Sequence, residues 1–263
     1  MDNNLSGNNP VQTTVVNSRN PYAIPAAIVI GFAMIAGAIY FSGGNSKIAE
    51  NNNQPNPNAE TGTETTGPVR PVDENDHIRG NPNAPIVIVE YSDYDCPFCK
   101  NYHETMTRIM ESYGVKGQVA WVYRQFPIEQ LHPSAPRLAQ ASECVADLAG
   151  NDAFWKFSDL VFGEREVNEQ TNMARLSEFA VTAGASKNAF EECLNSGQMK
   201  SVVEQDMIDG RNAGAKGTPY SVVIVGDQQG VINGAQPYSN VSQIIETLLS
   251  QIKGAEGSAE SEA

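Results

Sequence analysis

The chain has 263 residues, of which 40% are hydrophobic and 18% are charged. This length accommodates one domain of moderate size together with appended segments. The 31 acidic residues outnumber the 17 basic ones, and the formal net charge is −14 without a dominant acidic run. A nucleic-acid-binding protein needs a basic face. The balance therefore argues against nucleic acid as a partner, and we interpret the charge as one that solvates a soluble domain.

An uncharged segment lies near the amino terminus, between two polar ones. Residues 21–41 carry no charged side chain, and a helix of that length spans about 30 Å, the thickness of a bilayer core. We expect a transmembrane anchor there, preceded by a disordered segment at 1–20 and followed by a flexible linker at 42–75. A cleaved signal peptide is the alternative, with Ala36-Gly37-Ala38 as a crude cleavage site.

Residues 76–253 carry the patterns of a folded domain, and residues 254–263 are expected to form a frayed tail. The expected elements are, in chain order, a buried strand at 86–89, a helix at 97–113, a strand at 119–123, helices at about 133–212, a hairpin of strands at 221–225 and 230–233, and a final amphipathic helix with Val241, Ile244, Ile245, Leu248 and Ile252. This order predicts an α/β domain in which a βαβ unit and a ββα unit share one sheet, with a helical insertion between them.

The most informative motif is Cys96-Pro97-Phe98-Cys99, between the first strand and the first helix. Two cysteines at this spacing can form a disulfide across one helical turn, and the N–H groups at a helix start favour the thiolate of the first. Zinc sites use the same spacing, but no second such pair follows, and only His103 offers a third ligand. We therefore predict neither a metal nor another cofactor. A purely structural disulfide is a further alternative.

Residues 90–100, with the sequence EYSDYDCPFCK, resemble the active-site signature of the DsbA-like thioredoxin-fold oxidoreductases. Arg124-Gln125-Phe126-Pro127, Gly217-Thr218-Pro219 and Gly234-Ala235-Gln236-Pro237 match further parts of that pattern. The resemblance covers roughly residues 77–252. It implies a thioredoxin-like fold with an inserted helical subdomain.

Carried over to this chain, the resemblance implies that Cys96 is the exposed nucleophile and Cys99 the buried resolving cysteine. Pro219 is then the cis-proline, a form essentially confined to X–Pro bonds. The backbone of Thr218 is expected to pair with an extended substrate segment, as an added strand does. Considered alone, Thr218-Pro219 would be an ordinary strand entry; together with the Cys-x-x-Cys motif, we prefer the cis-proline.

Pro97 and Phe98 are expected to contact substrate, because their place at the helix start exposes the neighbouring sulfur. Phe98 replaces the histidine of the best-known members, and Asp93 and Asp95 add negative charge nearby. We therefore predict that the pKa of Cys96 lies below that of a free cysteine, but less far below it than in the strongest oxidants. Asp95 is alternatively a cap for the helix.

Glu90 lies six residues before Cys96 and interrupts an apolar strand. Thioredoxin-like proteins often carry a buried acid at this place. Burial raises the pKa of a carboxyl group, so Glu90 is a candidate for relaying a proton to or from Cys99. An exposed glutamate at a strand end is the alternative.

The other two cysteines, Cys144 and Cys193, both lie in the expected helical insertion. A disulfide between them would close a long loop and stabilise the fold by roughly 4 kcal/mol on loop-entropy grounds. Two buried free thiols are the alternative. Neither is expected to take part in catalysis.

These patterns together predict a membrane-anchored, extracytoplasmic thiol–disulfide oxidoreductase that forms disulfides in exported proteins through Cys96 and Cys99. Four cysteines suit an oxidising compartment, so the catalytic domain is expected in the periplasm or at the cell surface, tethered to the cytoplasmic membrane. The expected partners are exported proteins with free thiols and, by the resemblance, a membrane reoxidase; we expect a monomer. The alternatives are a reductase or isomerase of the same fold, and a tethered binding or chaperone module with a structural Cys-x-x-Cys.

Overall fold

The computed structural model describes residues 67–261. The segments expected at 1–20 and 21–41, and most of the linker expected at 42–75, lie outside the described residues. Within the described part of the chain, no helix is both long and apolar enough to cross a membrane.

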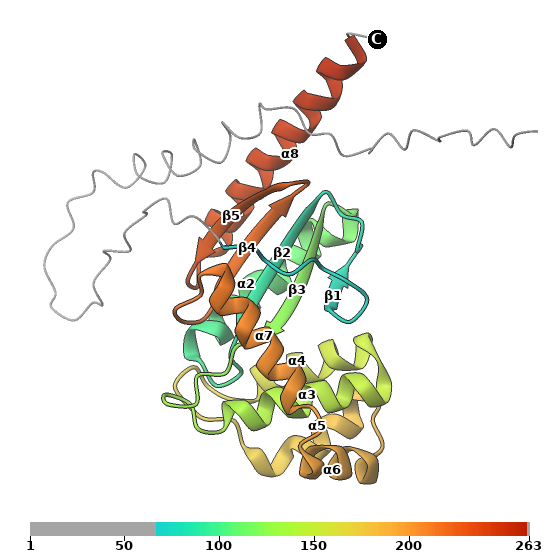
Figure 1. The fold of residues 1–263 in the computed structure, drawn as a ribbon, viewed down its shortest axis with the longest axis vertical. Helices are drawn as coiled ribbons and strands as arrows, with labels where there is room; N and C mark the ends of the chain where they lie inside the picture. The colour runs from blue at the N-terminus through green and yellow to red at the C-terminus, as the bar shows by residue number, and fades with distance from the viewer. Residues whose placement is uncertain (1–66, 262–263) are drawn as a thin grey trace, which may run out of the picture.

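The described part forms one mixed sheet with helices on both faces (Figure 1). The elements are β1 (His77–Gly80), β2 (Ile86–Ser92), α2 (Pro97–Ser112), β3 (Val119–Gln125), α3 (Ala135–Ala149), α4 (Asn151–Glu164), α5 (Leu176–Ala183), α6 (Lys187–Ser196), α7 (Lys200–Ala213), β4 (Tyr220–Val225), β5 (Gln228–Asn233) and α8 (Tyr238–Ser261). The strand order is β1-β3-β2-β4-β5. The thioredoxin-like α/β architecture predicted from the sequence is confirmed.

The two central strands, β2 and β3, run parallel, and every other pair in the sheet is antiparallel. In β2 only Val87 is partly exposed, as its run of β-branched residues predicts for a strand covered on both faces. The β4–β5 hairpin is also present, and its turn lies at residues 226–227, slightly earlier than expected. The edge strand β1 was not expected, because its sequence HIRG is short and largely polar.

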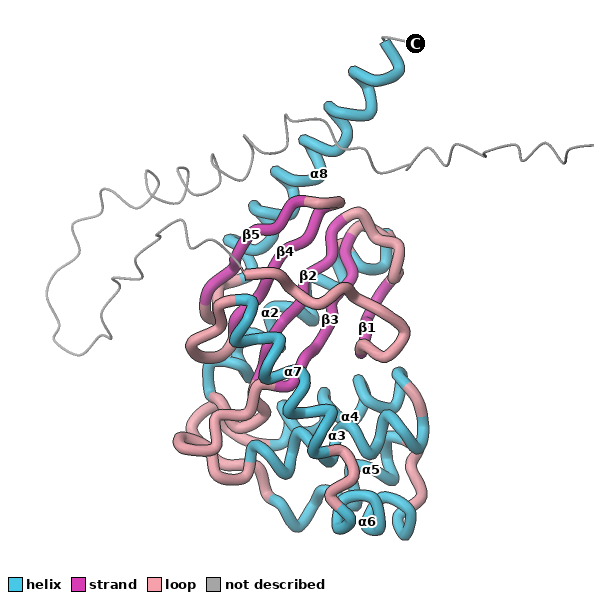
Figure 2. Tube along the Cα trace, in the orientation of Figure 1, coloured by secondary structure: helices cyan, strands magenta, loops and turns pink. Residues whose placement is uncertain are grey.

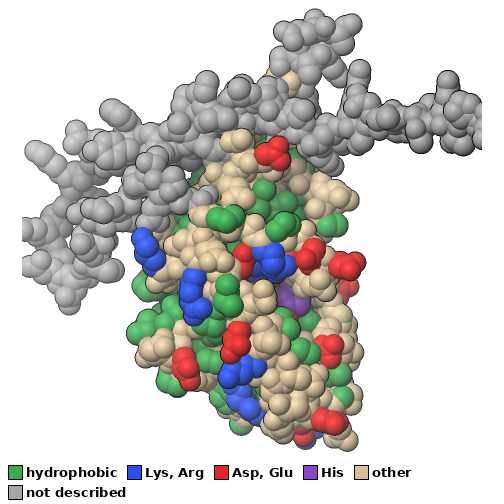
Figure 3. Space-filling view, in the orientation of Figure 1, with side chains coloured by type: hydrophobic (Ala, Val, Ile, Leu, Met, Phe, Trp, Pro, Cys, Tyr) green, Lys and Arg blue, Asp and Glu red, His purple; other side chains and the backbone are tan. Residues whose placement is uncertain are grey.

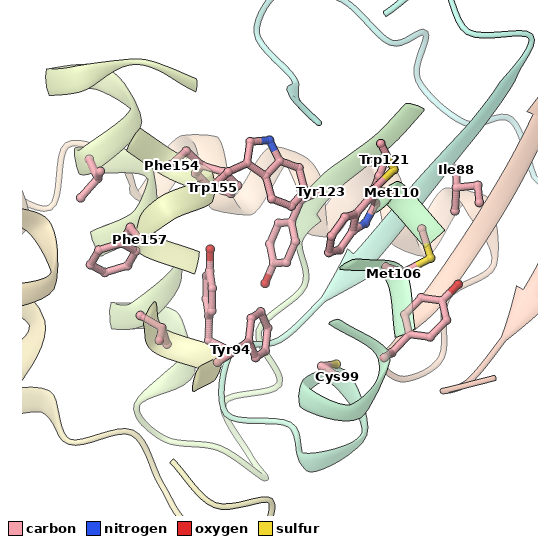
Figure 4. Packing of buried hydrophobic residues seen from close by; sticks show 14 of the residues in the cluster. Ile88, Tyr94, Cys99, Met106, Met110, Trp121, Tyr123, Phe154, Trp155 and Phe157 are labelled. Carbon is pink, nitrogen blue, oxygen red and sulfur yellow. The ribbon is translucent and has the colours of Figure 1, made fainter. Parts of the chain in front are cut away.

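Helices lie on both sides of the strands (Figure 2), and each face of the sheet has its own apolar cluster. On one face Ile88, Trp121 and Tyr123 pack with side chains of α2, α4 and α8, and Figure 4 shows how the aromatic rings of this cluster fill the space between sheet and helices. On the other face Val89 and Val122 belong to a smaller cluster that α7 covers. Alternation along each strand therefore sends one set of side chains towards α2 and the other towards α7.

The helical insertion is shorter than the stretch of 133–212 expected for it. Helices α3 to α6 pack on one another beyond one end of the sheet, whereas α7 lies across the sheet itself (Figure 1). Gly210 explains how α7 approaches so closely: a Cβ atom there would lie 2.6 Å from Cδ2 of Phe126 and 2.9 Å from Cδ1 of Tyr91. The helical periodicity predicted α7 but not the face on which it packs.

The folded part begins before residue 76, where the sequence placed its boundary. Val69 is buried in the cluster beneath α7, and Arg70 forms an ion pair of 2.8 Å with Asp76. At the other end α8 continues to Ser261, through most of the tail expected at 254–263, and projects beyond the sheet (Figure 1). On the face drawn in Figure 3, acidic and basic side chains are interspersed.

Candidate active site

The Cys96–Cys99 pair lies where the carboxyl end of β2 turns into α2. Cys96 is the N-cap residue of the helix, with φ −69° and ψ 125°, and Pro97 follows at the first helical position. Proline suits that position because its fixed φ matches the helix and its missing N–H would have no helical partner. Cys96 therefore lies among the free N–H groups of the first turn, and Cys99 one turn further on.

Both thiols of the pair are free in this structure, and their environments differ. A hydrogen bond from the Cys99 thiol lowers the pKa of Cys96 to about 6 against the opposing effect of burial, with help from the backbone N–H groups of Cys99 and Phe98. Burial raises the pKa of Cys99 well above its ordinary value. At neutral pH the pair is thus a thiolate at Cys96 and a thiol at Cys99. This agrees with the predicted depression of the Cys96 pKa.

Cys96 is less accessible than the resemblance implied, because only 4% of its surface is exposed. The carbonyl oxygen of Thr218 lies 3.5 Å from its sulfur atom. Phe98, by contrast, is 60% exposed beside the pair. The site therefore presents an apolar ring to solvent and keeps the reactive sulfur close beneath the loop that holds Thr218.

Pro219 reaches the redox pair through the topology of the sheet. Antiparallel pairing of Tyr220 with Tyr91 places the start of β4 beside the end of β2. The Thr218–Pro219 bond there is cis, as the resemblance implies. Thr218 remains partly exposed, whereas Pro219 is buried.

Glu90 is fully buried in β2, which agrees with the first of its two predicted placements. Its Oε2 accepts a hydrogen bond of 2.9 Å from Nε1 of Trp121. Burial raises the pKa of Glu90 to about 7, and the charge of Glu90 contributes to the raised pKa of Cys99. A carboxyl group beside Cys99 is therefore able to gain or lose a proton near neutral pH.

Two aspartates fix the loop that precedes Cys96 through hydrogen bonds to distant segments. Oδ2 of Asp93 accepts hydrogen bonds from the N–H of Ile128 and from Nδ1 of His132, of 2.8 and 2.9 Å. Oδ1 of Asp95 accepts from the N–H and the hydroxyl group of Thr171. The capping role considered for Asp95 is not observed, because its side chain bonds to the loop beyond α4 and to Ser134, which precedes α3.

Arg165 is a residue of this site that the sequence did not point to. It lies just after α4, and Nη2 donates hydrogen bonds to the carbonyl oxygens of Tyr94 (2.8 Å) and Cys96 (3.0 Å). No short-range pattern could have found it, because Cys96 and Arg165 are 69 residues apart in the chain.

His103, the third ligand considered for a zinc site, is buried. Its Nε2 lies 2.8 Å from Oδ1 of Asp159, its ring stacks on Phe162, and burial lowers its pKa. Within residues that the structure describes, no group of three or more His, Cys, Asp or Glu side chains is arranged to hold a metal.

Cys144 and Cys193 form a disulfide that joins α3 to α6 within the insertion, with Cα atoms 5.9 Å apart. The residues at its two ends are buried. This bond lies in a different part of the fold from the free pair and belongs to the framework of the insertion.

A free dithiol at a helix start, a cis-proline beside it and a sheet with a helical insertion define a dithiol protein of the thioredoxin fold. The family model described as Thioredoxin matches residues 72–247, and the chain belongs to that family.

Solved structures of DsbA-type proteins share this fold. BdbD from Bacillus subtilis superposes with a TM-score of 0.60 at 24% sequence identity, over 70% of this chain and 98% of that one. For α-DsbA1 of Wolbachia pipientis the TM-score is 0.58 at 20% identity, over 70% and 96% of the two chains.

Sequence relatives include Na⁺/H⁺ antiporters and a protein named for disulfide chemistry. A Na⁺/H⁺ antiporter NhaA 1 of Mycolicibacterium gilvum is 37% identical over 125 residues, which are 47% of this chain and 19% of the antiporter. The chain thus spans about a fifth of the length of the first curated relatives that it matches. A Rickettsia typhi protein, named as a candidate protein-disulfide oxidoreductase, is 26% identical over 185 residues, 68% of this chain and 63% of that protein.

Proposed function

We propose that this protein is a thiol–disulfide oxidoreductase that acts as a dithiol oxidase on exported proteins. The observation that carries the proposal is the opposite perturbation of two neighbouring thiols: the pKa of Cys96 is lowered to about 6 and that of Cys99 is raised. The two thiols therefore have different roles in exchange: Cys96 has the lower pKa and is the better leaving group, and it is slightly more exposed than the fully buried Cys99.

The reaction starts from the Cys96–Cys99 disulfide. A substrate thiolate attacks the sulfur of Cys96, the Cys96–Cys99 bond breaks, and Cys99 leaves as a thiolate that takes up a proton. Glu90 is placed to supply that proton, since its pKa of about 7 keeps a large protonated fraction at neutral pH. A second substrate thiolate then attacks the mixed disulfide and releases the Cys96 thiolate. The substrate loses two electrons, and the protein gains them.

Substrate is held beside Cys96 by the loop that carries Thr218 and by the ring of Phe98. The partly exposed Thr218 precedes β4, so its backbone is positioned to pair with an extended segment. Pro97 and Phe98 border the sulfur at the start of α2, and the exposed ring offers apolar contact to an unfolded chain.

The direction of electron flow follows from the stability of the reduced form. A lower Cys96 pKa stabilises the thiolate and makes the pair more oxidising; a value of about 6 lies between about 7 in thioredoxin and about 3.5 in DsbA. The test is the equilibrium of the pair with glutathione. We expect a potential well above the roughly −270 mV of thioredoxin; a value at or below it would indicate a reductase.

A matched set of variants separates exchange from simple binding. Cys96→Ser should abolish oxidation of a reduced peptide while the protein stays folded, whereas Cys99→Ser should trap a mixed disulfide through Cys96. If Cys96→Ser retained full function, the Cys-x-x-Cys would be structural and the protein a tethered binding or chaperone module.

We further propose a membrane tether through residues 21–41, with the domain outside the cytoplasm, a membrane reoxidase as partner and a monomeric state. The support for the tether is the uncharged run at residues 21–41, which is long enough to cross a bilayer core as a helix. The full chain should stay with membranes in alkaline carbonate, and deletion of residues 21–41 should release it. Light scattering of the detergent-solubilised protein should give the mass of a monomer. If a membrane reoxidase uses quinone, the Cys96–Cys99 pair should accumulate in its reduced form in cells that lack quinone.

A further inference from the structure

The guanidinium group of Arg165 lies buried against the redox loop, with 3% of the residue exposed. Nη2 donates to the carbonyl oxygens of Tyr94 and Cys96, at 2.8 and 3.0 Å. Nη1 donates to those of Val167 and Glu169, at 3.1 and 3.0 Å. One side chain thus joins the residue before α2 to the segment that follows α4. Because the Cys96 carbonyl also accepts the N–H of Lys100, Arg165 bonds directly to the first turn of the redox helix.

The charge of Arg165 lacks the carboxylate that a buried arginine ordinarily has. All four of its hydrogen-bond acceptors are neutral carbonyl oxygens, and within the described chain no carboxylate lies within ion-pair distance of it. Arg124 is equally buried but forms ion pairs with Asp76 and Asp209. A buried cation without an ion pair is costly. The charge of Asp95 lowers part of that cost, and the thiolate of Cys96, when it forms, lowers it further.

We propose that Arg165 is a positioning residue for dithiol exchange: it fixes the backbone of Cys96 at the start of α2 and supplies the buried positive charge that stabilises the Cys96 thiolate. The inference rests on the proposed role of Cys96 as the exchanging sulfur. The disulfide form contains no thiolate, so Arg165 stabilises the reduced form selectively and makes the pair a stronger oxidant.

Several other ionisable groups lie on the elements around the pair, and their partners differ from those of Arg165. They are Glu90 in β2, Asp93 and Asp95 in the loop, Lys100 in α2, and His132 before α3. The two aspartates are held by His132, Ser134 and Thr171. The Nζ of Lys100 donates to the carbonyl oxygen of Phe162 at 2.7 Å. Lys100 reaches the carbonyl oxygen of Cys96 through its backbone N–H, whereas Arg165 reaches it through its charged side chain.

The test compares Arg165→Met and Arg165→Lys in the full chain, with thiolate absorbance followed against pH and the glutathione equilibrium measured at pH 7. Arg165→Met should raise the pKa of Cys96 from about 6 to about 7 or higher. That change makes the disulfide form about fivefold more favourable at pH 7. Arg165→Lys keeps the charge but loses the planar fork, so its pKa should fall between the two.

Arg124→Met is the matched control, because it also removes a buried arginine. It should lower stability and leave the pKa of Cys96 unchanged. A folded Arg165→Met with the wild-type pKa at Cys96 would overturn the proposal and leave Arg165 a purely structural role. Oxidation of a reduced peptide is measured separately. If the wild-type protein does not oxidise the peptide, the proposed function is wrong. If the pKa of Cys96 does not depend on Arg165, this inference is wrong.

A measurement on the unaltered side chain covers the case in which Arg165→Met does not fold. The ¹⁵Nε resonance of Arg165 should shift with a midpoint near the Cys96 pKa, and the shift should vanish in Cys96→Ser. The resonance of Arg124 should not move over the same range. If the chemical shift of Arg165 does not change as Cys96 ionises, the proposal is wrong.

Discussion

Glu90 links the chemistry of the site to the stability of the fold. Its carboxyl group is fully buried, and burial raises its pKa to about 7, whereas an unfolded chain ionises glutamate near about 4.3. The folded state therefore favours the neutral form. The resulting stability is fully present below about pH 4 and is lost as the pH rises to about 7.

Glu90→Gln should remove this dependence on pH. Relative to the wild type, the variant should gain up to about 3 kcal/mol in free energy of unfolding between pH 4 and pH 8, measured by urea denaturation of the reduced protein. It should also slow reduction of the Cys96–Cys99 disulfide by a peptide dithiol about tenfold or more, because the proton donor for Cys99 is gone.

Asp206→Asn is the control for this prediction. Burial raises the pKa of Asp206 to about 7 as well. Its carboxylate, however, accepts hydrogen bonds from the N–H of Gln125 and from Arg70, and it has no part in the proposed proton transfer to Cys99. Asp206→Asn should therefore flatten stability against pH without slowing the exchange. Equal slowing in both variants would show that the effect of Glu90 is not a local proton transfer.

The sequence predicted the residues of the site that belong to short motifs or to a strand pattern. Cys96 and Cys99 carry their own spacing signal, Pro219 follows from the resemblance, and Glu90 stands out as an acid in an apolar strand. Arg165 has no such signal. Its contact depends on how the insertion docks against the redox loop, and that docking is decided by packing between distant segments.

At the scale of single elements, the position of α7 depends on a glycine. A Cβ atom at Gly210 would lie 2.6 Å from the ring of Phe126, so Gly210→Ala must push the helix away from the sheet. We expect a loss of about 1–3 kcal/mol in free energy of unfolding. Gly163→Ala in α4 is the matched control: its Cβ meets nothing within 4 Å, and it should gain up to about 1 kcal/mol. Similar effects at both glycines would contradict this account of α7.

The stability of the helical insertion depends on its disulfide. The Cys144–Cys193 bond closes a separation of 49 residues, which on loop entropy is worth about 4 kcal/mol. The double variant Cys144→Ala/Cys193→Ala should lose about this much stability to urea while the pKa of Cys96 stays in place. A loss below about 1 kcal/mol would mean that the unfolded chain gains little freedom when the bridge is removed.

The periodicity of apolar residues identified most helices and strands, because each of these elements is buried either on one face or on all sides. It placed β2, α2, β3 and the hairpin near their observed bounds, and it predicted α8 but not its continuation to Ser261. It failed for β1, whose four residues HIRG gain strand structure only by pairing with β3. It also assigned α7 to the insertion, since a helical pattern shows that a face is buried but not what covers it.

At the scale of the whole molecule, the segment that precedes β1 closes the domain. Val69 is buried, and the backbone N–H of Arg70 donates a 2.8 Å hydrogen bond to Oδ1 of Asp209 in α7. The carbonyl oxygen of Arg70 accepts from the buried Arg124 of β3 at 3.1 Å. Residues 67–75 therefore bridge the sheet and the helix on its second face, although their polar composition predicted a flexible linker.

A chain that begins at residue 76 should therefore be less stable than one that begins at residue 67. It loses the burial of Val69, worth about 1.5–3 kcal/mol, and leaves Asp209 and Arg124 with fewer partners. We expect a total loss of about 3 kcal/mol in urea denaturation, because hydrogen bonds to charged groups add to the apolar burial. Val69→Asp in the longer chain should reproduce most of that loss, since it places an unpaired charge in the same cluster. Equal midpoints for the two chain lengths would instead mean that this segment adds no stability and that the domain begins at residue 76, where the sequence placed it.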